Sequence, residues 1–88
     1  MPEISRFFGI VITMYYNYNN HGLPHFHAKY GGHKAKILVE NGVIIDGTLP
    51  RRAALLVEEW RIAHLGELHS VWRQIIDRKP HVKIEPLE

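Results

Sequence analysis

Two histidines, His25 and His27, stand two residues apart in the segment LPHFHAKYGGHKAKI, and the lysines Lys29, Lys34 and Lys36 follow them. Imidazole titrates near neutral pH and can act as a general base or a general acid. A lysine nearby can hold a phosphate group or stabilise an oxyanion. One interpretation is therefore metal-independent, ribonuclease-like chemistry, with His25 and His27 as the acid–base pair and Lys36 as the phosphate clamp.

The same histidines allow a metal site. Two histidines at positions i and i+2 of one strand lie about 6.5–7 Å apart at Cα and can chelate one ion. His21 could supply a third nitrogen ligand, and zinc accepts such a set. The neighbouring lysines oppose a dication, so we expect no cofactor and keep His21, His25 and His27 as the alternative. A third interpretation is a solvated sheet face whose lysines only prevent aggregation.

The placement of these side chains depends on a hairpin turn. Gly31 and Gly32 form a two-residue signal for a β-hairpin. In that register Lys29 faces Lys34, and His27 faces Lys36. Because side chains alternate between the faces of a strand, the core face would carry Phe26, Ala28, Tyr30, His33, Ala35, Ile37 and Val39. The opposite face would be cationic, and a slip of one residue would exchange the two faces.

The cationic face predicts an anion-binding surface. Lys29 opposite Lys34 is a like-charge pair, which is mildly destabilising unless an anion or a carboxylate relieves it. A phosphate group would do so, which makes Lys29, Lys34 and Lys36 candidate RNA or anion ligands. Arg51 and Arg52 join them as candidates, because they open the predicted helix where its dipole disfavours positive charge.

The elements that must position this segment change type halfway along the chain. Alternating apolar residues over 7–14 indicate a strand, and Asn41-Gly42 predicts a second turn. An apolar stripe at helical spacing runs from Ala53 to Ile76, after Pro50 at the first helical position, with Gly66 dividing it into two helices. We therefore expect an α+β fold, with a three- to four-stranded antiparallel sheet in the N-terminal half covered on one face by one or two C-terminal helices.

Length and composition narrow the class of protein. The chain has 88 residues, which predicts a single domain over residues 1–88. It has no cysteine, which excludes disulfides, a thiolate nucleophile and a thiolate zinc site. No apolar run approaches the roughly 20 residues that span a bilayer, and no signal peptide is visible. We expect a cytoplasmic protein without a membrane partner, and its net charge of +2 allows an acidic protein or RNA as partner.

Several motifs together resemble one bacterial family. They are MPEISRFFGIVI, PHFHAKYG, GTLPRRA, EEWRIAHLGEL and KIEPL, and they extend over almost the whole chain. The chain resembles the family of the domain of unknown function DUF4160, although LPHFH stands where members often have two prolines. The resemblance implies a small stand-alone bacterial protein of a toxin–antitoxin-like pair, in which the toxin acts on RNA or translation. It matches His25 and His27 as candidate functional residues and Trp60 as a structural one.

Three functions follow as expectations. The first is a toxin-like protein that binds or cleaves RNA through the His/Lys-rich face and is covered by a cognate antitoxin-like protein. The second is a non-enzymatic protein-interaction module, and the third is a histidine metal-binding module. The sequence leaves the catalytic step and the oligomeric state open.

Overall fold

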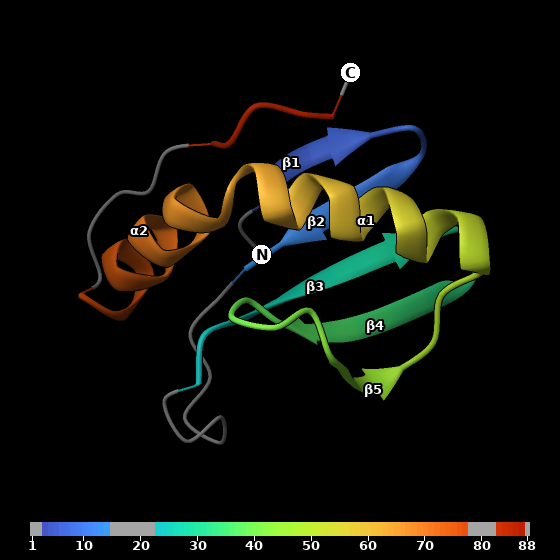
Figure 1. The fold of residues 1–88 in the computed structure, drawn as a ribbon, viewed down its shortest axis with the longest axis horizontal. Coiled ribbons are helices and arrows are strands. Elements are labelled where there is room, and N and C mark those ends of the chain that lie inside the picture. The colour runs from blue at the N-terminus through green and yellow to red at the C-terminus, as the bar shows by residue number, and fades with distance from the viewer. Residues whose placement is uncertain (1–2, 15–22, 78–82, 88) are drawn as a thin grey trace.

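The structure is a computed structural model that describes residues 3–14, 23–77 and 83–87. Its elements are β1 (Glu3–Phe7), β2 (Ile10–Thr13), β3 (His25–Tyr30), β4 (His33–Leu38), β5 (Ile44–Gly47), α1 (Arg51–Ala63) and α2 (Leu65–Ile76). The strands form one antiparallel sheet in the order β1-β2-β3-β4-β5 (Figure 1). The α+β fold is confirmed, and the sheet has five strands where three or four were expected.

One additional strand arises from a turn inside the alternating N-terminal segment. Phe8 and Gly9 have φ angles of +50° and +82°, and Phe7 pairs with Ile10 on either side of them. The chain therefore reverses within residues 7–14, where the sequence pattern indicates one continuous strand. A phenylalanine is an unusual residue at a left-handed position, so this turn carries no recognisable signal.

The predicted Gly31-Gly32 hairpin is confirmed, together with its register. Lys29 pairs with Lys34, and His27 pairs with Lys36. The core side of the hairpin is buried as expected from Phe26 to Val39, but its tip is open: Tyr30 is 38% exposed, and His33 is exposed as well.

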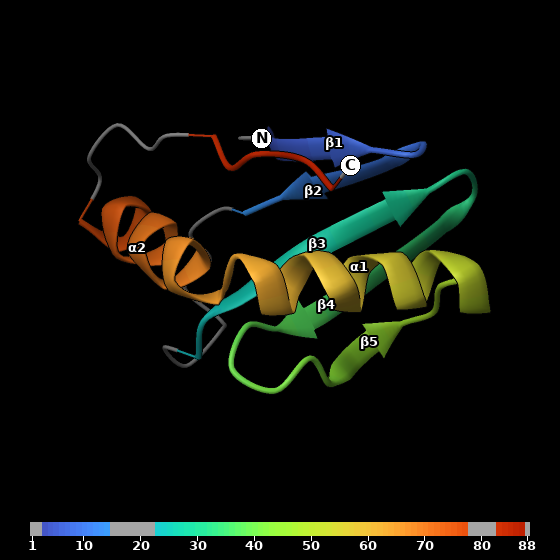
Figure 2. The same cartoon turned by 45° about the horizontal axis from the view of Figure 1, so that its top comes forward.

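The core lies between α1 and one face of the sheet (Figure 2). Trp60 of α1 is fully buried, and its ring centroid lies 5.4 Å from that of Phe7 and 5.8 Å from that of Phe26. The predicted helical stripe supplies Ala53, Val57, Trp60, Leu68, Trp72 and Ile75 to this core. Val71 is buried there as well, whereas Ile76 at the end of the stripe is exposed. Burial of these side chains is the main force that holds the helices against the sheet.

The helical region divides at His64, two residues before the predicted Gly66. The His64 N–H bonds to the carbonyls of Trp60 and Arg61, which ends α1, and the His64 carbonyl accepts from Leu68 in the first turn of α2. Pro50 stands just before α1, where its missing N–H costs nothing. In the part of the chain that the structure describes, neither helix is long and apolar enough to cross a membrane.

The C-terminal residues return to the first strand. Ile84 donates its N–H to the carbonyl of Ile4 at 2.8 Å, and Trp60 Nε1 donates to the carbonyl of Glu85 at 2.9 Å. Residues 83–87 run beside β1 in both views (Figures 1 and 2). This contact covers the β1 edge of the sheet and closes the core over Trp60.

Candidate anion-binding face

We call the sheet face opposite α1 the open face. Directly paired residues of antiparallel strands point to the same face, so the register assigns its members. They are Arg6, Val11, Thr13, His25, His27, Lys29, Lys34, Lys36, Leu38 and Asp46. The predicted histidine and lysine residues of the hairpin therefore share one face, and side chains from β1, β2 and β5 join them.

Most of the positive charge of the open face lies in one row of paired residues that crosses β1 to β4. Arg6 pairs with Val11, Val11 with Lys29, and Lys29 with Lys34. With neighbouring strands about 4.8 Å apart, the row spans about 14 Å. We call these four residues the cationic row. The sequence did not reveal that Arg6 belongs to it, because that placement depends on the unrecognised turn at Phe8.

The two lysines of the cationic row have no internal counterion within the described ranges. Both are exposed, and the ion pairs there involve other residues. Arg6 does have one, since its Nη2 lies 2.7 Å from Glu3 Oε1 at the surface. The repulsion between Lys29 and Lys34 is therefore left for solvent ions or a bound anion to relieve.

A second row places His27 beside Lys36. Thr13 pairs with His27, His27 with Lys36, and Lys36 with Asp46. His27 is half-buried, and burial lowers the pKa of its imidazole to about 4. The nearby His25, Lys34 and Lys36 also lower this pKa, and Asp46 opposes them. The ring is therefore neutral at neutral pH, where it can accept a proton or a hydrogen bond.

His25 lies beneath the surface next to His27. It is only 1% exposed, and its ring centroid lies 4.9 Å from that of Trp72 in α2 and 5.5 Å from that of His27. Its Nδ1 is 3.0 Å from the carbonyl oxygen of Leu23. Because a carbonyl oxygen only accepts, Nδ1 carries the proton, and burial lowers the pKa of this ring below its usual value.

The two histidines thus have different surroundings. The structure brings them together, as the sequence predicts, but only His27 has appreciable contact with solvent. The His25 ring contacts both the ring of His27 and that of Trp72 in α2. The sequence could not indicate this burial, because it results from a contact between residues far apart in the chain.

Arg51 and Arg52 lie apart from the open face. They are exposed at the start of α1, which covers the other side of the sheet, and they line a shallow depression with Leu55, Leu56 and Glu59. The chain reaches them from Thr48, whose N–H donates to the carbonyl of Lys34 at 3.1 Å. They are therefore at the same end of the sheet as the Gly31-Gly32 turn, and the structure does not combine them with His27 and Lys36.

The predicted metal ligands are only partly described. His21 lies outside the described residues. Within those residues no group of three or more histidine, aspartate or glutamate side chains is arranged to hold an ion.

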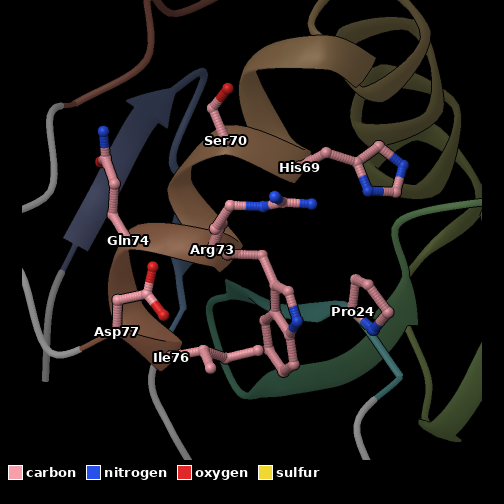
Figure 3. Close-up of a pocket in the computed structure, with 8 residues that line it drawn as sticks. Pro24, His69, Ser70, Arg73, Gln74, Ile76 and Asp77 are labelled. Atoms are coloured by element: carbon pink, nitrogen blue, oxygen red, sulfur yellow. The ribbon is translucent and has the colours of Figure 1, made fainter.

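A separate open hollow of about 960 Å³ lies along α2. Its lining consists of Pro24, His69, Ser70, Trp72, Arg73, Gln74, Ile76 and Asp77. Figure 3 shows His69 and Arg73 reaching from α2 over the side of the hollow nearest Pro24. Trp72 lies between this hollow and His25, so the hollow is a surface distinct from the open face.

The comparisons with known proteins give one match. The comparison with curated proteins found no match, and the comparison with solved structures found none either. The sequence profile of one family, described as Domain of unknown function (DUF4160), matches residues 9–73, from the β1–β2 turn into α2. This segment includes β2 to β5, with both histidines and all three lysines of the open face. The chain therefore belongs to the DUF4160 family.

Proposed function

We propose that this protein binds RNA through its open face, as the toxin-like component of a toxin–antitoxin-type pair. The observation that carries the proposal is the cationic row, in which the exposed side chains of Arg6, Lys29 and Lys34 lie on the sheet face opposite α1. Phosphate contacts supply most of the sequence-independent affinity for nucleic acids. A sheet face is also a common platform for single-stranded RNA.

The state of the histidines supports binding more than cleavage. General acid catalysis requires a protonated group near the leaving oxygen. Burial lowers the pKa of His25 and so favours its neutral form, and His27, with a pKa of about 4, is neutral at pH 7. A neutral His27 beside Lys36 fits a hydrogen bond from a ribose hydroxyl, next to a phosphate held by the lysine.

The cognate antitoxin-like protein would cover the same surface. A face that carries Lys29, Lys34 and Arg6 is complementary to an acidic protein surface, and such complementarity accelerates association. The partner would therefore compete with RNA for the cationic row. The same surface would therefore bind either RNA or the antitoxin-like protein.

A titration of a fluorescein-labelled single-stranded 12-nucleotide RNA at 50 mM salt tests the proposal. The double variant Lys29→Ala/Lys34→Ala should weaken binding about tenfold or more, since two phosphate contacts are lost. Arg73→Ala is the matched control, because Arg73 is an exposed cation of α2 that lines the hollow away from the open face. The control should bind within about twofold of wild type. Absence of wild-type binding at 100 µM protein, or an equal loss in the control, would overturn the proposal.

A further inference from the structure

The β1–β2 turn contains an exposed aromatic residue in a strained conformation. Phe8 is 57% exposed and has a φ angle of +50°, followed by Gly9 at +82°. Two consecutive positive φ angles between paired Phe7 and Ile10 are typical of a type I′ turn, whose first position favours asparagine, aspartate or glycine. A bulky residue with positive φ is an outlier that points to a purpose other than turn formation.

A second partly exposed ring lies next to this turn. Ile10 pairs with Tyr30, so the Phe8-Gly9 turn and the Gly31-Gly32 turn occupy the same end of the sheet (Figure 1). The Tyr30 ring lies against Gly9, where an added Cβ would meet its Cε1 at 3.3 Å. Tyr30 is 38% exposed. Gly9 thus serves both the turn and the seating of the tyrosine.

The Phe8 ring contacts a residue of the hydrophobic core. Its ring centroid lies 6.5 Å from that of Phe7, with the two planes 82° apart, and Phe7 is itself 5% exposed and packed on Trp60. Phe8 therefore has a fixed neighbour on one side and solvent on the other. Two aromatic surfaces, held by the fold, are presented to solvent at one end of the molecule.

The surrounding charge indicates the chemistry of a ligand. Tyr30 and His33 form the pair directly next to the Lys29–Lys34 pair of the cationic row, about 3.3 Å along the strands, with their side chains on the opposite face of the sheet. Both pairs are exposed at the hairpin end, so an extended ligand that passes over this end of the sheet can contact both. Arg6 stands two residues before Phe8. A ligand that satisfies lysines and exposed aromatic rings together carries a polyanionic backbone and flat apolar groups, which is the composition of a nucleic acid.

We propose that Phe8 and Tyr30 form a stacking site for an unpaired base of the RNA whose phosphates contact Lys29 and Lys34. This inference rests on the proposed function and adds that the RNA is single-stranded at this end of the sheet. Stacking on aromatic side chains is sequence-tolerant because every base presents a flat face. Base pairing in a duplex would hide those faces from the rings.

Phe8→Asn is the most informative variant, because asparagine followed by glycine is the preferred type I′ pair. It removes the ring and keeps the turn. We expect about 5-fold or more loss of affinity for the labelled 12-nucleotide RNA, with a melting temperature equal to or above that of wild type. Tyr30→Leu should weaken RNA binding in the same way, and Phe8→Trp should retain it. Affinity for inorganic polyphosphate, a polyanion without bases, should stay within about twofold in all three variants.

The outcomes separate this inference from the function on which it rests. Wild-type affinity for RNA in both Phe8→Asn and Tyr30→Leu, together with loss in Lys29→Ala/Lys34→Ala, would overturn base stacking, leave RNA binding in place and assign the exposed rings to a protein partner. Equal wild-type affinity for duplex and single-stranded RNA would also overturn base stacking. A large drop in melting temperature for Phe8→Asn would make Phe8 structural, against the proposal. Absence of RNA binding by wild type would overturn both.

Discussion

Lys29 of β3 and Lys34 of β4 face each other directly across the Gly31-Gly32 hairpin, and both side chains are exposed on the open face. The pair is aligned with Arg6 through Val11, so three cations follow one line across the sheet. A fold that needed only solubility would gain from a carboxylate at one of these positions. We interpret the repulsion between Lys29 and Lys34 as a sign of an anion-binding surface, because a bound phosphate would relieve it.

The variant Lys34→Glu separates stability from binding. An opposite-charge pair would replace the repulsion, so we expect the free energy of unfolding to rise by about 0.5–1 kcal/mol in urea titrations at low salt. RNA affinity should fall in the same protein, because the lysine that contacts a phosphate is replaced by a carboxylate that repels it. Arg73→Glu, on α2 and away from the open face, changes the net charge equally and should leave RNA affinity within about twofold of wild type. Lower stability of Lys34→Glu than of wild type would show that the pair is not strained by its charge.

The salt dependence of RNA binding counts the phosphates that are contacted. For four cationic contacts, from Arg6, Lys29, Lys34 and Lys36, the plot of log K against log salt should have a slope of about −3. Removal of Lys29 and Lys34 should make that slope shallower by about 1.4. Titrations between 50 and 300 mM KCl measure both slopes. Parallel lines for the two proteins would place the phosphates away from the cationic row.

Acid should destabilise the protein through His27. Its pKa is about 4 in the folded state and near 6.5 when exposed, so below pH 6.5 the unfolded chain binds more protons and stability falls as pH falls toward 4. At pH 5 this group alone should cost about 2 kcal/mol relative to pH 7.5. Buried His25, whose pKa is also lowered, adds to the loss in the same direction. Urea unfolding at the two pH values measures the effect.

His27→Gln is the control for that assignment. Glutamine cannot titrate, so this variant should lose less stability than wild type on going from pH 7.5 to pH 5. The same pH-dependent loss in wild type and variant would assign the acid sensitivity to other groups, such as the carboxylates of Glu3 and Glu58, whose pKa values are lowered by Arg6 and Arg61.

Arg61 should be essential for stability. It is 6% exposed, binds both carboxylate oxygens of Glu58 at 2.6 and 2.7 Å, and donates through Nη1 to the carbonyl of Val39 at 2.8 Å. Arg61→Ala would leave this carbonyl without its donor, so we expect a loss of about 2–4 kcal/mol in urea unfolding. Arg73→Ala, at an exposed position of α2, is the control and should change stability by less than about 0.5 kcal/mol. A loss below 1 kcal/mol for Arg61→Ala would contradict this role.

Much of the fold could be predicted because local signals agreed with it. Gly31-Gly32 set the register of the central hairpin, and with it the shared face of His27, Lys29, Lys34 and Lys36. The helical stripe through Trp60 likewise predicted the side of the helices that packs on the sheet.

Other features depend on contacts that no local pattern encodes. Buried His25 contacts Trp72, which is forty-seven positions later in the chain, and Arg61 donates a hydrogen bond to the carbonyl of Val39. The β1–β2 turn at Phe8 could not be recognised from the sequence, because turn signals are based on residues that adopt positive φ easily.

The most direct test of the central claim is a titration of the ¹⁵N-labelled protein with the 12-nucleotide RNA, followed through its backbone amide signals. We expect the largest shifts at Val11, Lys29, Lys34 and Lys36, with little change at Leu55 and Ile62 on the solvent side of α1. Shifts concentrated on α1 and α2, with an unchanged open face, would contradict it.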